Sequence, residues 1–255
     1  MLHVRPDISK PKLELAAEER ERSHLRSIAT PLLCIAVAIR AFLFDFDGLI
    51  LDTETASRAG WEWLYRKHGQ ELPPEKWASI VGTTGVWSPM DHLEDLVGEP
   101  LEREALNDQR YAHEISLIEA EELRPGIADY IEAAARHGLK RAIVSSSSRF
   151  WIDMHLERLE RAYGWDAILT ADRDRARAKP NPTMYLEALD VLGVDASEAV
   201  VFEDSPNGVK AARAAGIFVV AIPNNVTRDF GLDEADLVVE SLADLPPDEL
   251  LARFS

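Results

Sequence analysis

The second half of the chain alternates between short apolar runs and segments with apolar residues at helical spacing. The apolar runs have the length of strands and lie at residues 139–144, 167–170, 199–202 and 218–222. Helix-period segments precede them at 127–137, 150–159, 182–192 and 206–215, and a short run at 237–239 and a helix at 247–254 follow. This alternation predicts an α/β fold with a doubly wound, Rossmann-like parallel sheet and helices on both faces.

Residues 54–122 follow a different pattern. Segments of helical period lie at 56–68, 73–80, 89–97 and 101–122, and no run from 53 to 123 alternates as a strand does. We therefore predict an all-helical domain inserted into the α/β domain. The α/β domain then consists of residues 37–53 and 123–255.

Residues 1–36 are predicted to lie outside the core domain, as a weakly ordered extension. A charged, helix-prone segment at 13–26 precedes an apolar run at 31–39, which superficially resembles a secretory signal. The charged segment is rich in glutamate, and the apolar run continues into the first strand without a cleavage site of small residues. Export is therefore disfavoured, and the run is far shorter than the roughly 20 residues that span a bilayer.

The net charge and the cysteine content indicate which binding partners and which cellular compartment to expect. The chain carries 28 basic and 45 acidic residues, a net charge of −17. This charge disfavours nucleic acid and anionic membrane surfaces as partners. The single cysteine, Cys34, excludes an internal disulfide and a cysteine-rich metal site. We therefore predict a cytoplasmic protein.

Two carboxylates mark the end of the first predicted strand. The apolar and aromatic run that begins at Phe42 ends in Asp45, Phe46, Asp47 and Gly48. Because side chains alternate along a strand, Asp45 and Asp47 are predicted on one side, with Phe46 buried on the other. Like charges this close require a cation, a shared proton or hydrogen bonds, and Mg²⁺ is the simplest stabilising ligand. An ordinary acidic turn after a strand is the alternative.

Polar residues also follow other predicted strands, at the edge where a doubly wound sheet binds its ligands. Ser145 and the backbone N–H groups that start at Ser146 can bind an oxyanion at a helix N-terminus, although serines there are often only caps. Glu203 and Asp204 end another strand, so four carboxylates are predicted to converge, which favours a metal site. Lys179 precedes a helix and supplies the positive charge that a phosphate beside acids requires.

Four motifs resemble, in order, those of the haloacid dehalogenase superfamily, in the subgroup with a helical cap inserted after the first strand. They are Asp45-Phe46-Asp47-Gly48, Ser145, Lys179-Pro180 and Glu203-Asp204. The segments DGLILDTE, KPNPTMY and VFEDSPNGVKAARAAG are most similar to the β-phosphoglucomutase-like phosphatases of that superfamily. The resemblance covers about residues 41–245 and implies that the inserted domain, residues 54–122, is a cap over the active site.

The resemblance implies a Mg²⁺-dependent phosphatase that hydrolyses a small phosphomonoester, such as a sugar phosphate. Asp45 would be the nucleophile that forms an aspartyl-phosphate, and Asp47 the general acid and base. Mg²⁺ would be held by Asp45, the backbone carbonyl of Asp47, Asp204 and, directly or through a second layer, Glu203. Three further residues would bind the transferring phosphoryl group: Ser145, Ser146 and Lys179.

A sugar-phosphate mutase is the main alternative. Mutases of this type carry a serine-arginine pair in the cap loop and a histidine in the first cap helix, which hold a second phosphate. Here Thr83 and Thr84 follow Gly82 in that loop, and Ser57 takes the place of the histidine, so a phosphatase is expected. A dehalogenase is disfavoured because Asp47 is present, and a phosphonate hydrolase because neither cap lysine lies in an apolar setting.

A third hypothesis is a non-catalytic module that binds sugar phosphates or a protein partner. The complete set of acidic residues disfavours it. Thr84 and Trp87, in and after the cap loop, are predicted to contact the substrate, although Trp87 is equally suited to the core of the cap. Capped members of the superfamily are usually monomers, so a monomer is expected.

Overall fold

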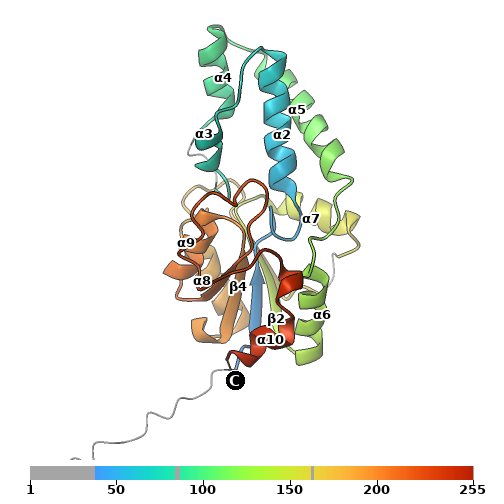
Figure 1. Cartoon of the computed structure of the whole chain (residues 1–255), viewed down its shortest axis with the longest axis vertical. Helices are drawn as coiled ribbons and strands as arrows, with labels where there is room; N and C mark the ends of the chain where they lie inside the picture. Colours follow the sequence, from blue (N-terminus) through green and yellow to red (C-terminus); the bar gives the residue numbers. More distant parts are fainter. Residues whose placement is uncertain (1–37, 84–86, 162–163, 255) are drawn as a thin grey trace, which may run out of the picture. The chain divides into compact units, whose positions relative to one another are not determined.

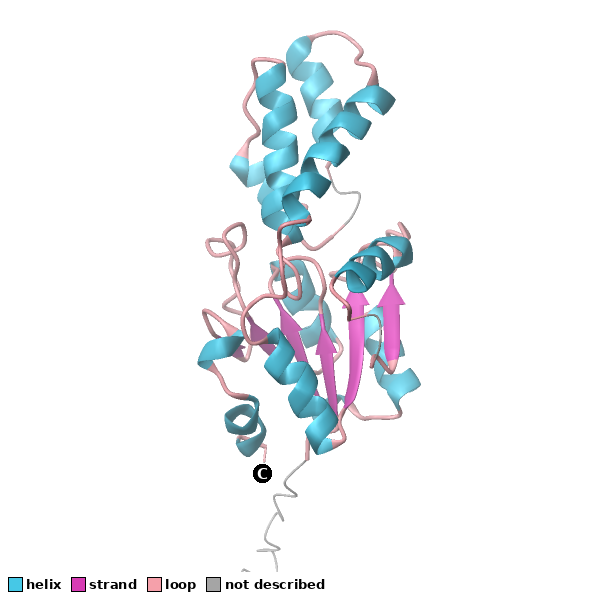
Figure 2. Ribbon diagram, turned by 90° about the vertical axis from the view of Figure 1, so that its right-hand side faces the viewer, coloured by secondary structure: helices cyan, strands magenta, loops and turns pink. Residues whose placement is uncertain are grey.

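Among the residues that the computed structural model describes, 38–83, 87–161 and 164–254, six strands form one parallel sheet. The strands are β1 (Ala41–Phe44), β2 (Lys140–Ser145), β3 (Ala167–Thr170), β4 (Ala199–Glu203), β5 (Phe218–Ala221) and β6 (Leu237–Val238). Their order across the sheet is β3-β2-β1-β4-β5-β6. The order reverses between β1 and β4, which creates a crevice at the carboxyl ends of these strands. The predicted doubly wound sheet is confirmed (Figure 2).

Different helices cover the two faces of the sheet. In β1, Phe42 and Phe44 point to one face and Leu43 to the other, and all three are fully buried. The first face is aromatic, with the rings of Phe44 and Phe202 stacked at 5.0 Å between centroids. Three helices cover this face: α6 (Ile127–His137), α7 (Arg149–Arg158) and α10 (Pro247–Ala252). Smaller side chains line the second face, under α8 (Thr183–Leu192) and α9 (Pro206–Ala214).

Several element boundaries differ by a few residues from the predicted ones. β1 ends at Phe44, before the predicted alternation reaches Asp47, and the chain then turns, with the Phe46 carbonyl accepting N–H groups from residues 49–51. Two 3₁₀ helices, at Ala196–Glu198 and Leu242–Asp244, complete the core. Across the described ranges, no helix combines the length and the apolar character that a membrane span requires.

Four helices form the inserted domain between β1 and α6, as the pattern of residues 54–122 predicts. They are α2 (Thr53–Lys67), α3 (Pro74–Ala78), α4 (Pro89–Val97) and α5 (Arg103–Ile118). Helices α2 and α5 lie side by side (Figure 1). Helix α2 begins three residues before its predicted start, because the Asp52 side chain accepts the N–H of Thr55 and caps the helix.

A loop and a hydrophobic cluster are among the contacts between the inserted domain and the core. The cluster contains Leu64 and Leu93 of the insertion together with Val226, which follows β5 in the core. Residues 81–83 lie against the strand ends, and the Gly82 carbonyl accepts a hydrogen bond of 3.1 Å from Ser146 Oγ. Gly82 has a φ of +71°, and a Cβ there would lie 2.1 Å from Ser205 Oγ. Only glycine fits this close contact, which keeps the insertion over the sheet edge.

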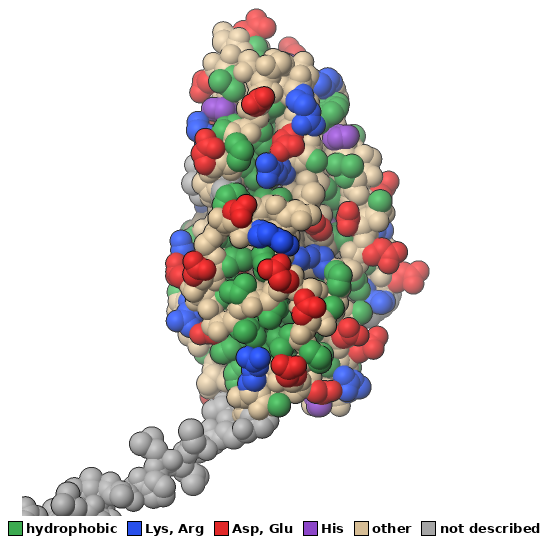
Figure 3. Space-filling view, in the orientation of Figure 1, with side chains coloured by type: hydrophobic (Ala, Val, Ile, Leu, Met, Phe, Trp, Pro, Cys, Tyr) green, Lys and Arg blue, Asp and Glu red, His purple; other side chains and the backbone are tan. Residues whose placement is uncertain are grey.

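The predicted N-terminal extension, residues 1–36, lies outside the described residues. On the face of the described part shown in Figure 3, Lys and Arg side chains lie among Asp and Glu side chains. The described residues also include exposed ion pairs, such as Arg213 with Asp236. Mixed charge of this kind is typical of a solvated surface.

Candidate active site

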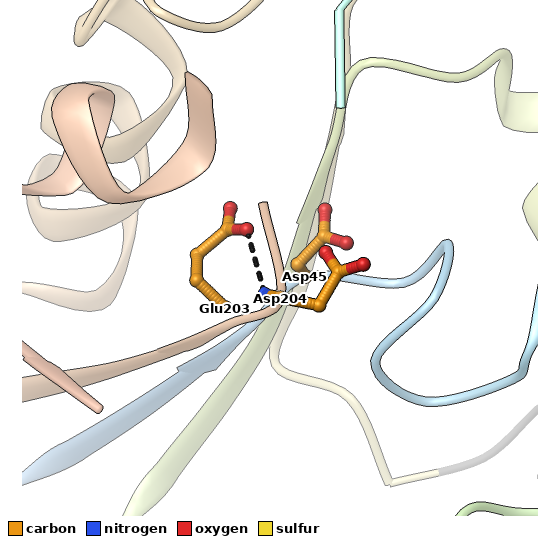
Figure 4. A group of neighbouring side chains, drawn as sticks. All are labelled: Asp45, Glu203 and Asp204. Carbon is orange, nitrogen blue, oxygen red and sulfur yellow. Dashed lines mark hydrogen bonds between the residues drawn. The ribbon is translucent and has the colours of Figure 1, made fainter. Parts of the chain in front are cut away.

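Three buried carboxylates meet in the crevice between β1 and β4. Asp45 follows β1, Glu203 ends β4 and Asp204 comes directly after it (Figure 4). One oxygen of each lies within 4.8 Å of the others, and the three residues are at most 5% exposed. Burial, followed by the charges of neighbouring carboxylates, raises the pKa of Asp204 well above its usual range.

The donor set of this cluster fits a divalent cation. All three groups offer oxygen atoms, the ligands that Mg²⁺ prefers. Asp204 Oδ2 accepts a hydrogen bond of 2.6 Å from Asn224 Nδ2, whereas Asp204 Oδ1 is buried and has no hydrogen-bond partner among the described residues. A buried oxygen of this kind is costly without a ligand. The cluster therefore suits a metal ion.

Lys179 compensates part of the negative charge. Its side chain is 1% exposed, and Nζ donates to Asp45 Oδ1 and, at 2.6 Å, to Glu203 Oε1. Burial alone would lower the pKa of Lys179, but the charges of Asp45 and Glu203 outweigh burial and raise it. Tyr185 Oη also donates to Glu203 Oε1, at 2.6 Å. Glu203 is thus the most fully occupied of the three carboxylates, while Asp45 and Asp204 retain free oxygens.

The Asp47 carboxylate is separate from this cluster. Thr53 Oγ1 and Trp151 Nε1 donate to its Oδ1 at 2.8 and 2.7 Å, and Ser147 Oγ and Ser145 Oγ donate to its Oδ2 at 2.6 and 3.2 Å. The structure therefore brings together three of the four carboxylates that the sequence predicts to converge. Neutral donors surround the fourth instead, because β1 ends before Asp47 and the chain turns there.

The four consecutive serines that begin at Ser145, the last residue of β2, have different partners. Ser145 Oγ accepts the N–H of Ser147 at 3.0 Å in addition to its contact with Asp47. Ser146 Oγ contacts the cap loop and also accepts the N–H of Lys179 at 3.2 Å. Ser148 caps α7, as a serine before a helix commonly does. Ser145 and Ser146, the two serines that are predicted to bind phosphate, thus lie at the crevice. Ser147 lies there as well and contacts Asp47.

A cavity of about 500 Å³ extends from Asp45 and Asp47 to the inserted domain. The core side also includes Ser145, Trp151 and Arg173. Helices α2 and α5 form the opposite wall, which we call the cap wall, with the residues Glu54, Ser57, Trp61, Arg110, Tyr111 and Glu114. Burial, and then the charges of Asp47 and Asp45, raise the pKa of Glu54 to about 8.

Of the two predicted cap contacts, only Trp87 belongs to the described residues, and it does not line this wall. Thr84 falls outside the described residues. Trp87 packs against the hydrophobic cluster of the insertion, with its ring 5.4 Å from that of His92. This is the alternative role that the sequence analysis gives to Trp87. The cap loop reaches the cavity through its neighbours Gly82 and Thr83.

Sequence reasoning missed several residues of the site. Glu54 and Trp61 recur on one face of α2 with Ser57, which the sequence analysis names only as the residue at the position of the mutase histidine, but such a stripe equally predicts packing between helices. Trp151 lies 104 residues from Asp47 and Asn224 lies 20 from Asp204. No local pattern indicates these two contacts.

Comparison with known proteins agrees with the geometry. A family model described as hydrolase, haloacid dehalogenase-like hydrolase, matches residues 39–216. The chain is 39% identical over 207 residues to the putative phosphatase YhcW of Bacillus subtilis (strain 168), covering 81% of this chain and 94% of that protein. It is 31% identical over 207 residues to hexitol phosphatase A of Escherichia coli (strain K12), covering 80% and 91%.

Solved structures extend the similarity to the fold. The crystal structure of CbbY from Rhodobacter sphaeroides in complex with phosphate has a TM-score of 0.62 and 30% sequence identity, and covers 81% of this chain and 96% of that chain. The named relatives of the sequence are phosphatases, which agrees with the predicted phosphoric monoester hydrolase. The family match spans all four motifs and most of the chain, so this protein belongs to the haloacid dehalogenase-like hydrolases.

Proposed function

We propose that the protein is a Mg²⁺-dependent phosphatase that hydrolyses a small phosphomonoester through an aspartyl-phosphate at Asp45. The observation that carries this proposal is the buried group of Asp45, Asp204 and Glu203, with Lys179 bound to two of them. The family match and the phosphatases among the relatives support it. In this proposal Asp45, Asp204, the backbone carbonyl of Asp47 and, less directly, Glu203 hold Mg²⁺, which neutralises phosphate charge when bound.

In the first step, Asp45 attacks the phosphorus. A bond forms between an Asp45 carboxylate oxygen and phosphorus, the bond from phosphorus to the leaving oxygen breaks, and Asp47 gives its proton to that oxygen. Lys179 and Ser145 neutralise and orient the phosphoryl oxygens. The four hydrogen bonds to Asp47 support these different roles for Asp45 and Asp47. They hold the Asp47 carboxylate toward the cavity and apart from the acidic cluster.

In the second step, water replaces the alcohol. Asp47 takes a proton from water, the water oxygen bonds to phosphorus, and the bond between phosphorus and Asp45 breaks, which releases phosphate. The contact of Gly82 with Ser146 supports a closed arrangement in which the cap limits access of bulk water. The monomeric state and the cytoplasmic location stay predictions of the sequence.

The test is phosphate release from a panel of sugar, polyol and nucleotide monophosphates, with Mg²⁺ and with EDTA. We expect release only with Mg²⁺. The same reactions include β-glucose 1-phosphate, and formation of glucose 6-phosphate without release of phosphate would establish the mutase alternative instead. Binding without either reaction would support the non-catalytic module. The presence of Ser57 in the cap wall, where mutases carry histidine, supports the phosphatase.

A further inference from the structure

The cap wall contains a buried ion pair that the proposed reaction does not use. Arg110 and Glu114 lie one turn apart on α5, and Arg110 Nη1 donates to Glu114 Oε2. Their side chains are 14% and 7% exposed. The Arg110 guanidinium also lies over the Trp61 ring of α2, 4.9 Å from its centroid. This pair therefore joins the two helices at the cavity.

Close packing of the two helices holds the pair in place. Gly60 of α2 faces α5, and a Cβ there would lie 3.4 Å from the Arg110 carbonyl oxygen and from Glu114 Cβ. Glu114 and Ser57 of α2 both line the cavity. A buried ion pair loses its hydration and contributes little to stability. Its position on a cavity wall, rather than in the hydrophobic cluster of the insertion, indicates contact with a ligand.

The described residues of the cap wall include one compensated ion pair and one further carboxyl group. Glu114 neutralises Arg110, and Glu54 adds a second carboxyl group beside Asp47. Among the described residues of the cap wall, no basic side chain is left unpaired. A second phosphate or a carboxylate on the leaving group would meet these acids and lose its hydration without compensation. A hydroxyl group, in contrast, can accept a hydrogen bond from Arg110 and donate one to a carboxylate.

Aromatic rings complete the wall. Trp61 and Tyr111 line the cavity from the cap, and Trp151 of the core lies 6.1 Å from Tyr111 between ring centroids. Such rings present apolar faces to the C–H groups of a carbohydrate. Hydroxyl-binding groups beside aromatic faces are therefore what a polyhydroxylated ligand requires.

We propose that the cap wall is a leaving-group subsite for an uncharged polyol or sugar, in which Arg110 and Glu114 bind hydroxyl groups as a pair. This inference rests on the proposed phosphatase function and names its substrate class. The preferred substrate is then a monophosphate with no second anionic group. Arg173 also lines the cavity, but it is an exposed residue of the core after β3.

The experiment compares kcat/KM for two substrates that differ in one group. Sorbitol 6-phosphate ends in a hydroxymethyl group, and gluconate 6-phosphate ends in a carboxylate at the same position. Fructose 6-phosphate and fructose 1,6-bisphosphate form a second pair. In each pair, we expect the wild-type enzyme to have a kcat/KM at least about tenfold higher for the substrate without the additional anionic group. One unfavourable charge contact of about 1.4 kcal/mol gives that ratio.

Two variants test the role of the ion pair, because they should change the ratio of kcat/KM for gluconate 6-phosphate and sorbitol 6-phosphate in opposite directions. Glu114→Gln leaves Arg110 uncompensated and should raise the kcat/KM of gluconate 6-phosphate relative to sorbitol 6-phosphate by about tenfold. Arg110→Gln leaves Glu114 alone and should lower the same ratio. The matched control is Arg103→Gln, which breaks an ion pair with Glu94 on the cap, away from the cavity lining, and should leave the ratio unchanged.

The outcomes separate this inference from the proposed function. Equal or greater activity on the anionic members of both pairs overturns the uncharged subsite, and so does a ratio that moves in the same direction in both variants. Loss of the activity on fructose 1,6-bisphosphate in Arg173→Gln would show that the core binds the second phosphate. No Mg²⁺-dependent phosphate release from any substrate overturns the phosphatase itself. The wild-type comparison decides even if a variant folds poorly.

Discussion

The floor and the wall of the cavity are built in different ways. The floor consists of residues at or after the ends of strands, namely Asp45, Asp47, Ser145, Lys179, Glu203 and Asp204. Lys179 lies between Asp45 and Glu203 and compensates only part of the charge of the buried carboxylates. The cap wall consists of side chains from two helices, with one ion pair and aromatic rings. In our proposal the floor holds the phosphoryl group of any substrate, whereas the wall contacts the leaving group. Chemistry and substrate selection would then belong to separate parts of the chain.

Replacing the nucleophile should have the largest effect. In Asp45→Asn the amide cannot form the aspartyl-phosphate, so we expect kcat to fall by at least about 10⁴-fold, the scale seen when a nucleophile is removed. Phosphate release under saturating Mg²⁺ measures this effect, and it should be equal for every substrate. Substantial remaining hydrolysis would contradict the assignment of Asp45. Loss of activity on some substrates only would contradict the separation of floor and wall.

Removing a metal ligand should have the next largest effect. Asp204→Asn keeps the hydrogen bond to Asn224 possible but removes a negative charge from the cluster. We expect the Mg²⁺ concentration for half-maximal activity to rise at least about 100-fold, the upper range for residues that only support metal ligands. Asp233→Asn, at an exposed acid of the core, is the control. An unchanged Mg²⁺ dependence in Asp204→Asn would remove Asp204 from the metal site.

Trp151 contacts Asp47 of the floor and Tyr111 of the cap wall. The decrease in kcat on replacing Trp151 should depend on the leaving group. Trp151→Phe removes the N–H that Asp47 Oδ1 accepts, but three other donors to Asp47 remain. We expect kcat to fall about tenfold for alkyl phosphates, because a hydrogen bond to a charged acceptor contributes about 1.5–3 kcal/mol. The decrease should be much smaller for p-nitrophenyl phosphate, whose leaving group needs little protonation from Asp47.

A second tryptophan supplies the control for that measurement. Trp165 Nε1 donates to the Arg161 carbonyl at 3.0 Å, and its ring packs on Phe44, outside the cavity lining. Trp165→Phe should leave the dependence on leaving group unchanged. If Trp151→Phe slows both classes of substrate equally, Trp151 supports the fold rather than the position of Asp47.

His155 packs against Trp151 and Phe46, and we expect it to change the free energy of unfolding at acidic pH. It is 3% exposed, packs on Trp151 at 4.3 Å between ring centroids, and neither ring nitrogen has a partner among the described residues. Burial lowers its pKa to about 4. The unfolded chain therefore binds a proton near pH 6.5 that the folded protein does not, so stability is complete above this pH and falls between about 6.5 and 4.

The size of this loss is measurable by urea unfolding at several pH values. Each pH unit between the two pKa values costs about 1.4 kcal/mol, so we expect the free energy of unfolding at pH 5.5 to be roughly 1 kcal/mol below its value at pH 7.5 through this residue. In His155→Leu this contribution should disappear. His137→Leu, at an exposed histidine paired with Asp248, is the control. An identical pH dependence in wild type and His155→Leu would contradict the buried neutral state.

Most of the floor could be predicted from local patterns. Asp45, Ser145, Glu203 and Asp204 each follow an apolar run of strand length, and parallel strands end at one edge. Three of the four predicted carboxylates therefore meet as expected. Asp47 does not, because alternation along a strand no longer applies where the chain turns after Phe44.

The cap wall could not be predicted from its own sequence. Arg110 and Glu114 form an ordinary pair of opposite charges one turn apart, which on most helices is a solvated surface feature. Their burial results from the packing of α5 against α2, where Gly60 faces Arg110 and Glu114. Of the two residues that were predicted to contact the substrate, Trp87 packs against the hydrophobic cluster of the insertion, and Thr84 is outside the described residues.

The sequence by itself determined the sheet, the helical insertion and the acidic residues at the strand ends, because periodicity and strand-end chemistry are local properties. Only the tertiary structure decided which groups surround Asp47 and which face of the insertion meets the cavity. Trp151 reaches Asp47 across 104 residues of sequence, and the stripe of α2 that lines the cavity has the same period as a stripe that packs against another helix. Contacts of this kind depend on how distant segments pack, which no short segment encodes.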